Sequence, residues 1–381
     1  MRSTVATTPA WAEVSLKALR QNARNLAKLA HPSGLIAVVK ANAYGHGIVP
    51  ASKAFLQGGA KCLGVAFVQE GVTLRKAGIR CPIIVLTPTL EAELATLLKN
   101  KLTPQISSYE GAKALSKVAQ KLHLKKVGVH VKLDTGMGRV GFQAQGVQEF
   151  IDQLLSLPII KIEAFYTHLA TADWADPGYA SEQIRSFESA FEKMKAIFPG
   201  EPEDLNAHVA NSAALLTDFF PKMKGGWVRP GLAFYGVYPN ERSKKRVELV
   251  PAMQLKARII HIKDLDKGRS VSYGRTFFTK SETKVATLGI GYADGLFRSL
   301  SNKGFCLVKG KKVPLVGTVC MDMTMADVSK VPGVKVGDIA TLFGRDGQAV
   351  LPVEEQAALA GTISYELLCA VGERVPRVYI Q

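Results

Sequence analysis

The sequence contains little cysteine. Its 381 residues include five cysteines, an odd number, widely spaced and with no C-x-x-C pair. Such a set predicts neither a disulfide framework nor a metal site, and it is typical of a reducing compartment. The first fourteen residues lack the apolar core of a signal peptide, and no apolar run is long enough to span a membrane. We therefore expect a cytoplasmic protein with no membrane partner.

Acidic residues are also scarce, with 32 against 49 basic residues and a formal net charge of +17. This excess raises the possibility of nucleic-acid binding. However, no known nucleic-acid module is present, and Lys113, Lys117, Lys121 and Lys125 recur every four residues, as on one solvated helical face. We favour a soluble enzyme with lysine-rich outer helices, whose charge helps to attract anionic small molecules, over a partner of nucleic acid.

What the chain does contain is a long alternation of short apolar runs and helix-like stretches between residues 16 and 240. Eight strands alternating with helices over that length fit a (β/α)₈ barrel better than an open, doubly wound sheet. The expected strands are 35–40, 63–67, 83–87, 102–107, 127–133, 160–168, 205–210 and 232–237. The clearest expected helices are 16–30, 109–122, 144–156 and 181–198.

After residue 240 the pattern changes to short strands separated by glycine, aspartate and asparagine. The segment "VKGKKV" (308–313) predicts a tight hairpin. We expect a second, all-β domain here, with one helical stretch near 353–370.

In a (β/α)₈ barrel the active site lies at the carboxyl ends of the strands. The sequence places polar residues at or beside several of these ends: Lys40, Lys132, Asp134, Arg139, Tyr166, His168, Asn211, Ser212 and, just before the eighth expected strand, Arg229. Lys40 directly follows the apolar run "IAVV". A lysine desolvated there has a lowered pKa and can form a Schiff base with a carbonyl cofactor. The pattern alone is equally compatible with a lysine that pairs with a carboxylate.

Other patterns suggest different chemistry. "GMGRVG" (136–141) matches G-x-G-x-x-G, but a dinucleotide site also needs a surrounding βαβ unit and a later acid, so we interpret it as a loop that presents Arg139. No G-x-S-x-G is present, which argues against a hydrolase elbow. His130, His168 and His208 are conceivable metal ligands. We favour barrel-wall positions for His130 and His208.

Nine blocks in order resemble the alanine racemase family, which comprises fold-type III enzymes dependent on pyridoxal 5′-phosphate (PLP). The resemblance covers nearly the whole chain and rests on "AVVKANAYGHG", "VKLDTGMGRVGF", "YTHLATAD", "HVANSAA", "VRPGLAFYG", "VSYGR", "GIGYADG", "GTVCMDMT" and "TISYELL". It implies a (β/α)₈ barrel over 16–240. It also implies that residues 1–15 and 241–381 form a β-rich domain that completes the active site of a partner subunit in a homodimer.

The resemblance also implies residue roles. Lys40 would hold PLP covalently, Arg229 would face its pyridine nitrogen with His168 behind it, and Arg139 would contact the ring oxygen. Lys132 resembles a lysine that CO₂ converts to a carbamate, which would pair with Arg139; the alternative is an ordinary lysine paired with a carboxylate. The remaining cofactor-binding residues, most of them at the phosphate, would be Tyr44, Asn211, Ser212, Gly231, Leu232 and Tyr365.

Racemisation needs one base on each face of the substrate, and the resemblance assigns Lys40 to one face and Tyr273 to the other. A phenol is a weak base at its usual pKa, so a nearby arginine would have to lower it. Met321, supported by Asp322, would bind the substrate carboxylate, and Tyr292 and Tyr365 would narrow the entrance. Ser364 stands where the family often has asparagine, which leaves the breadth of substrates open.

The function implied is interconversion of L- and D-alanine, supplying D-alanine for peptidoglycan. Alternatives are a racemase with broader amino-acid specificity, a PLP-barrel decarboxylase and a non-enzymatic PLP carrier. Ser212 and Arg229 stand where such a decarboxylase has a glycine-rich loop and an acid. The β-rich domain and Tyr273 argue against a single-barrel carrier.

Overall fold

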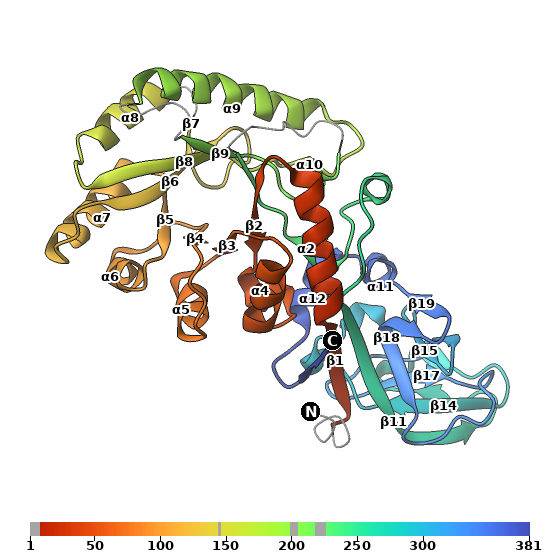
Figure 1. Ribbon diagram of the computed structural model, residues 1–381. Coiled ribbons are helices and arrows are strands. Elements are labelled where there is room, and N and C mark those ends of the chain that lie inside the picture. Colours follow the sequence, from red (N-terminus) through yellow and green to blue (C-terminus); the bar gives the residue numbers. More distant parts are fainter. Residues whose placement is uncertain (1–7, 144–145, 199–204, 218–225) are drawn as a thin grey trace. The chain divides into compact units, whose positions relative to one another are not determined.

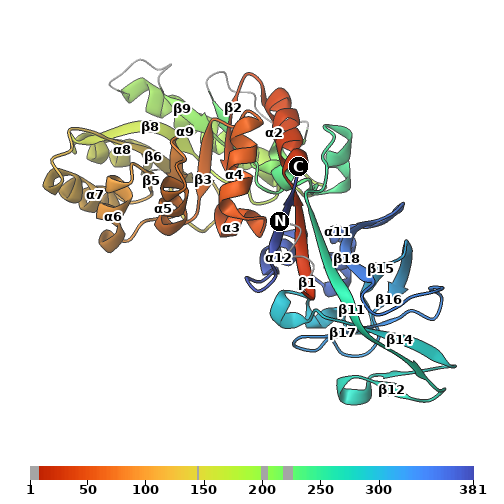
Figure 2. The ribbon, with the colours of Figure 1, turned by 60° about the horizontal axis from the view of Figure 1, so that its bottom comes forward.

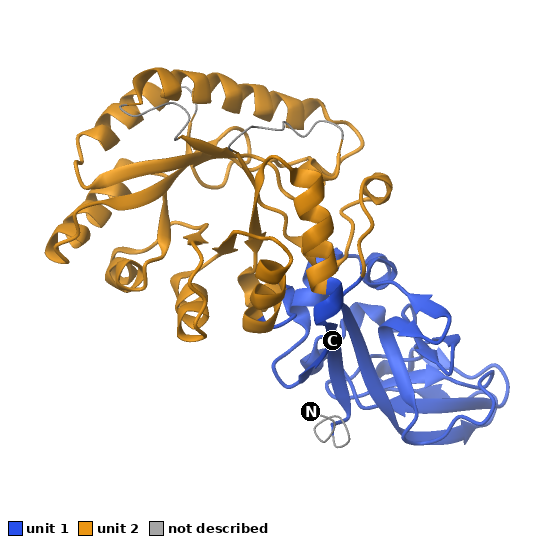
Figure 3. Cartoon of the chain, viewed as in Figure 1, with its two compact units in different colours: residues 1–18, 44–47, 251–381 blue, residues 19–43, 48–250 orange. Residues whose placement is uncertain are grey.

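A computed structural model describes residues 8–143, 146–198, 205–217 and 226–381. The chain divides into two compact units (Figure 3). The first, here the β unit, comprises residues 1–18, 44–47 and 251–381, and the second, the barrel unit, comprises residues 19–43 and 48–250. The short segment 44–47 therefore belongs to the β unit although it lies between two barrel segments in the sequence.

The barrel unit contains eight parallel strands in a closed ring, which confirms the predicted (β/α)₈ architecture. Each strand pairs with the next, and the last pairs back with the first. In ring order they are β2 (Gly34–Val38), β3 (Cys62–Val65), β4 (Ile83–Val85), β5 (Thr103–Ile106), β6 (Val127–Asp134), β8 (Ile160–Tyr166), β9 (Asn206–His208) and β10 (Trp227–Val228). The short β7 (Phe142–Gln143) adds to β6 outside the ring.

Helices surround the ring of strands (Figure 1). They are α2 (Leu16–Ala30), α4 (Ile48–Gln57), α5 (Val68–Lys76), α6 (Glu91–Lys99), α7 (Tyr109–Lys121), α8 (Val147–Leu155) and α9 (Gly178–Ile197). In α7, Leu115 is buried whereas Lys113, Lys117 and Lys121 are exposed, which confirms the predicted solvated face for these three lysines. The helix ends at Lys121, so Lys125 is exposed but does not belong to that face. The first two residues of the predicted helix 144–156 lie outside the described residues.

The eighth strand was predicted at the wrong place. The run "LAFYGV" is not a strand: Leu232–Tyr235 form the 3₁₀ helix η3, which ends at Gly236 with φ 83°. An apolar run predicts burial, and these residues are indeed buried, but burial does not select strand over helix. The strand that closes the barrel is β10, so Arg229 follows the eighth strand rather than preceding it. This correction places Arg229 at a carboxyl end, like the other candidates.

The β unit is built on a nine-stranded sheet in which β1 (Ala10–Ser15) lies between β11 (Met253–Leu265) and β20 (Arg377–Ile380) (Figure 2). The N-terminal strand thus belongs to the β unit. The other strands of the unit are β12 (Ser270–Val271), β13 (Phe277–Phe278), β14 (Thr283–Leu288), β15 (Phe305–Val308), β16 (Lys311–Pro314), β17 (Thr324–Asp327), β18 (Ile339–Asp346) and β19 (Ala349–Leu351). The predicted hairpin is confirmed as β15–β16, with Lys309 and Gly310 at its turn.

The helical stretch predicted near 353–370 is two helices, α11 (Val353–Ala360) and α12 (Ser364–Ala370), because Gly361 ends the first with φ 74°. Within the described residues, no helix combines the length and apolarity that a membrane span requires.

Candidate active site

Lys40 lies at the start of an unusual turn. The four residues after it, 41–44, all have φ between 51° and 54°, so the chain makes one turn of left-handed helix without glycine. Such a conformation costs roughly 1–2 kcal/mol per residue. Two hydrogen bonds hold the turn: Ala41 N–H donates to Glu70 Oε1 at 2.6 Å, and Ile48 N–H donates to Asn42 Oδ1 at 2.8 Å. Strain of this kind concentrates at functional sites.

The prediction that strand burial would desolvate Lys40 is wrong for this chain. β2 ends at Val38, the buried Val39 follows, and the side chain of Lys40 is exposed. The left-handed turn begins directly after Lys40, so the chain leaves the strand direction at this residue.

Arg229 is buried, with only 5% of its surface exposed, and several hydrogen bonds fix its guanidinium. One guanidinium nitrogen donates to His208 Nδ1 at 2.8 Å, and the other donates to the carbonyl of Thr167 at 2.6 Å. His168 Nδ1 lies 3.4 Å away, as expected for a supporting residue. Burial lowers the pKa of Arg229 to about 10, against a smaller opposing effect of Tyr166. The guanidinium therefore keeps its charge at neutral pH.

Two further histidines continue from Arg229 into the barrel. His130 Nδ1 lies 2.9 Å from His208 Nε2, and Tyr166 stacks on His208 with ring centroids 4.5 Å apart. Arginine only donates, so His208 accepts at Nδ1, carries its proton on Nε2 and donates that proton to His130. Burial first, then Arg229, holds the pKa of both histidines below the usual range, that of His130 at about 4. Both are barrel-wall residues, as predicted, but His208 also positions Arg229.

Lys132 is a buried amine in the same layer, 4% exposed, with Nζ 5.6 Å from the centroid of the Tyr166 ring. No hydrogen bond or ion pair is found for it among the described residues. Burial lowers its pKa to about 8, and the neighbouring cations Arg229 and Arg139 add to the effect. With this pKa, roughly a tenth of Lys132 is an uncharged, nucleophilic amine at pH 7 and the rest is charged.

The "DTGMGRVG" segment is a loop organised by Asp134. Its carboxylate accepts four backbone N–H groups, from residues 136–139, at 2.8–3.1 Å. Desolvation raises the pKa of Asp134, but these hydrogen bonds outweigh it and the net pKa is lowered. Gly141, with φ 128°, lets the chain pass Asp134, since a Cβ there would meet its backbone nitrogen at 2.5 Å. The loop presents an exposed Arg139, in agreement with the interpretation against a dinucleotide site.

Four cations meet at this end of the barrel. The pKa of His168 is held well below its usual range by burial and then by Arg229, Lys132, Arg139 and Lys40. Asp134, the acid of the loop that carries Arg139, already accepts four backbone N–H groups of that loop. Such a site favours a small, multiply anionic ligand. A PLP molecule, with its phosphate and phenolate, meets that requirement.

The predicted phosphate residues of the barrel unit also lie together. Asn211 caps the short helix α10 (Ser212–Leu215) by accepting the N–H of Ala214 at 3.0 Å. Ser212 Oγ accepts the N–H of Gly231 at 2.8 Å. The Gly231 N–H is therefore already used, whereas no partner for the Leu232 N–H is found among the described residues.

In the β unit the structure brings Tyr44 and Tyr365 together, with ring centroids 5.9 Å apart. Tyr44 is 6% exposed, and burial followed by the proximity of Tyr365 raises its pKa. A phenol in this state stays protonated and can donate a hydrogen bond.

The other predicted residues of the β unit converge on one face. Tyr273 is 72% exposed, and its carbonyl accepts from Thr318 Oγ1 at 2.9 Å. The loop that follows Thr318 carries Met321, whose carbonyl accepts the N–H of Ala293, next to Tyr292. Within the part of the chain that is described, no partner is found for the Met321 N–H. An anionic substrate group could use it.

Arg374 holds this face together and was not predicted from the sequence. It donates to Asp322 at 2.6 Å and to the buried Asp294 at 2.7 Å. Asp294 in turn accepts the N–H of Gly291 at 2.9 Å, beside Tyr292. Arg374 thereby links the loop of Met321 and Asp322 to the turn of Tyr292, although 52 residues separate it from Asp322.

Comparison with known proteins decides the family. The family model of the alanine racemase N-terminal domain matches residues 14–239, and that of the C-terminal domain matches residues 252–379. This chain belongs to the alanine racemase family. Members of this family are amino-acid isomerases. An alanine racemase from Methanococcus maripaludis is 42% identical over 375 residues, which are 98% of this chain and 99% of that protein.

Solved structures of the family have the same fold. The alanine racemase from Bacillus anthracis with bound L-Ala-P is 35% identical, with a TM-score of 0.89 over 98% of this chain and 95% of that one. The alanine racemase from Bartonella henselae with covalently bound pyridoxal phosphate is 28% identical, with a TM-score of 0.86 over 98% of this chain and 100% of that one.

Proposed function

We propose that the protein binds PLP through Lys40 and interconverts L- and D-alanine with two bases, Lys40 on one face of the substrate and Tyr273 of a second copy on the other. The observation that carries this proposal is the cluster of four cations around the carboxyl ends of the strands, with Lys40 among them. The bound ligands of the two solved relatives support it.

When bound, PLP would withdraw electrons from the α-carbon of the substrate and make its proton acidic. The chain supplies the rest. Lys40 Nζ removes or returns the proton on one face, and the Tyr273 hydroxyl does so on the other. Arg229, held by His208 and Thr167, offers a fixed N–H to the pyridine nitrogen but keeps its own proton. Because Arg229 keeps its proton, it would leave the pyridine nitrogen of bound PLP unprotonated, which would limit electron withdrawal and favour simple return of the proton.

In this proposal Leu232, Ser212, Tyr44 and Tyr365 bind the phosphate, and Arg139 contacts the ring oxygen. Asn211 orients the helix that carries Ser212. The Met321 N–H binds the substrate carboxylate, with Asp322 fixed by Arg374, and Tyr292 limits side-chain size. The product would be D-alanine for peptidoglycan, made in the cytoplasm by a homodimer with shared sites.

The decisive test is racemisation in D₂O. The PLP-loaded protein should convert L-alanine to D-alanine and place deuterium at the α-carbon of both, as read by NMR and chiral chromatography. Lys40→Ala should lose the covalently held chromophore and the activity, whereas Lys53→Ala, an exposed lysine of α4, should keep both. Absence of D-alanine and of deuterium from the wild type would refute the proposal. Serine in place of alanine tests the broader specificity.

The second base and the dimer are tested separately. Tyr273→Phe should slow proton removal from L-alanine more than from D-alanine, whereas Tyr109→Phe should change neither; equal losses would overturn the assignment of faces. Co-expressed Lys40→Ala and Tyr273→Ala should regain partial activity, because a mixed dimer has one intact site. Absence of rescue in purified mixed dimers would argue against shared sites.

A further inference from the structure

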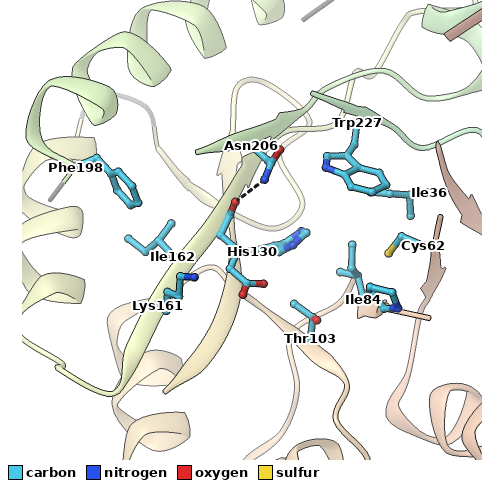
Figure 4. Close-up of a pocket in the computed structure, with 12 residues that line it drawn as sticks. Ile36, Cys62, Ile84, Thr103, His130, Lys161, Ile162, Phe198, Asn206 and Trp227 are labelled. Atoms are coloured by element: carbon cyan, nitrogen blue, oxygen red, sulfur yellow. Dashed lines mark hydrogen bonds between the residues drawn. The ribbon is translucent and has the colours of Figure 1, made fainter. Parts of the chain in front are cut away.

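The opposite end of the barrel contains a cavity that the proposed reaction does not use. Its volume is about 440 Å³, and each of the eight barrel strands contributes at least one lining residue, from the amino-terminal half or the middle of the strand (Figure 4). Barrel interiors are normally filled with side chains, and voids in folded proteins rarely exceed a water molecule. A hollow of this size lies within the range of small-molecule sites.

One wall of the cavity is apolar and includes the indole of Trp227. Ile36, Cys62 and Ile84 form a buried cluster against which Trp227 packs. Figure 4 shows these four side chains on one side of His130. Such a wall suits an aromatic or otherwise flat apolar body.

The acidic group that lines the cavity is the half-buried carboxylate of Glu163. The register of β6 against β8 skips Glu163, because Val129 pairs with Ile162 and His130 with Ala164. This bulge turns Glu163 to the cavity side, and Gly128 makes room for it, since a Cβ there would lie 2.3 Å from the carboxyl carbon. No hydrogen bond or ion pair of this carboxylate is found among the described residues.

Two residues that can carry a positive charge also line the cavity, and among the described residues neither forms an ion pair or hydrogen bond with the Glu163 carboxylate. His130 is neutral, because burial and then Arg229 hold its pKa at about 4. Lys161 also lines the cavity, but its side chain is exposed and no ion pair with Glu163 is found in the described part of the chain. A half-buried carboxylate beside an apolar wall favours a cation that can hydrogen-bond to it.

We propose that the amino-terminal mouth of the barrel is a second binding site, for a small organic cation with a flat apolar body. Its amidinium or ammonium group pairs with Glu163, and its body lies against Trp227. This site does not depend on the proposed racemase reaction.

The test uses the intact protein and three probes of one shape: benzamidine, benzamide and benzoate. Calorimetry measures affinity, and fluorescence quenching that Trp227→Phe abolishes locates the probe. Benzamidine should bind about tenfold more tightly than neutral benzamide, because charge-assisted hydrogen bonds are roughly twice as strong as neutral ones, and benzoate should bind most weakly. Equal binding of all three in the wild type would overturn the proposal without any variant.

Variants locate the interaction. Glu163→Gln should reduce benzamidine to the affinity of benzamide, whereas Glu188→Gln, an exposed glutamate on α9, should not. Thr103→Phe, which fills the cavity, should weaken both probes while racemase activity stays unchanged. Saturating alanine should not displace benzamidine. Displacement by alanine, or full affinity in Glu163→Gln, would place the probe elsewhere and refute the site.

Discussion

The two ends of the barrel are built on the same eight strands but differ in what fills the space between the strands. At the carboxyl end, polar side chains fill the space: Arg229 makes hydrogen bonds to His208 and Thr167, and it is one of four cationic residues that lower the pKa of His168. At the amino end the space is left hollow, with an apolar wall and one carboxylate. His130, which lines the cavity at the amino end, contacts His208, which binds Arg229 at the carboxyl end. Position relative to the strand explains the contrast. Lys40, Arg139 and Arg229 come after their strands, so the conformation of the loops sets the direction of their side chains. At the amino end the alternation of side chains along each strand sets the direction, except at the bulge that turns Glu163.

The largest expected effect on the difference between the two ends comes from replacing Arg229 at the carboxyl end. Arg229→Gln should lower kcat/KM for alanine by about 10²–10³, the usual effect of losing one fixed donor in a reacting site. It also leaves His208 and the Thr167 carbonyl without their donor, so the melting temperature should fall. At the amino end, Thr103→Phe should leave kcat/KM within about twofold. A loss below about tenfold in Arg229→Gln would show that the hydrogen-bonded layer is not essential.

Lys132 offers the next largest effect. Its pKa of about 8, set first by burial and then by Arg229 and Arg139, makes its neutral amine available to attack CO₂, forming a carbamate and releasing a proton. With ¹³C-bicarbonate, a carbamate NMR signal should grow from pH 7 to 9 at constant dissolved CO₂, as the neutral fraction rises. Lys132→Gln should lack it and lose about tenfold or more in kcat/KM, since Arg139 would lose a charged partner. Lys53→Gln should keep the signal. A signal that survives in Lys132→Gln would assign it to another lysine.

The sequence predicted most of the barrel because its buried strands are continuous apolar runs of the right length. It failed at the eighth strand, where β10 has only two residues and the more apolar 232–237 segment is a 3₁₀ helix. It assigned His208 to the wall but missed its role, because the bond to Arg229 spans 21 residues and depends on the closed ring. Arg374, Glu70 and Glu163 were missed for the same reason: each acts through a contact that no local pattern encodes.

Asp134 gives a smaller, pH-dependent effect. Asp134→Asn replaces a carboxylate that accepts four backbone N–H groups, so the loop carrying Arg139 should loosen and the melting temperature fall by a few degrees at pH 7. Because the folded pKa is lowered, the stabilisation is complete above the unfolded pKa of about 3.9 and is lost as pH falls through the folded value. The difference between wild type and variant should therefore begin to shrink only as the pH falls below about 3.9. Asp152→Asn, at an exposed helix position, should show no such convergence.

The smallest expected effect concerns the position of the Glu163 carboxylate at the amino end of the barrel. Gly128→Ala places a methyl group where the Glu163 carboxylate now lies, and the flexible end of that side chain can move aside. We expect a melting temperature within about 2 °C of wild type, since the loss is below about 1 kcal/mol. The advantage of benzamidine over benzamide should nevertheless decrease, because the carboxylate no longer faces the cavity. Adding Gly128→Ala to Glu163→Gln should change nothing further, and Gly146→Ala, where a Cβ meets no atom, should retain the full advantage. An undiminished advantage in Gly128→Ala would show that the position of the carboxylate does not control the charge preference of the cavity.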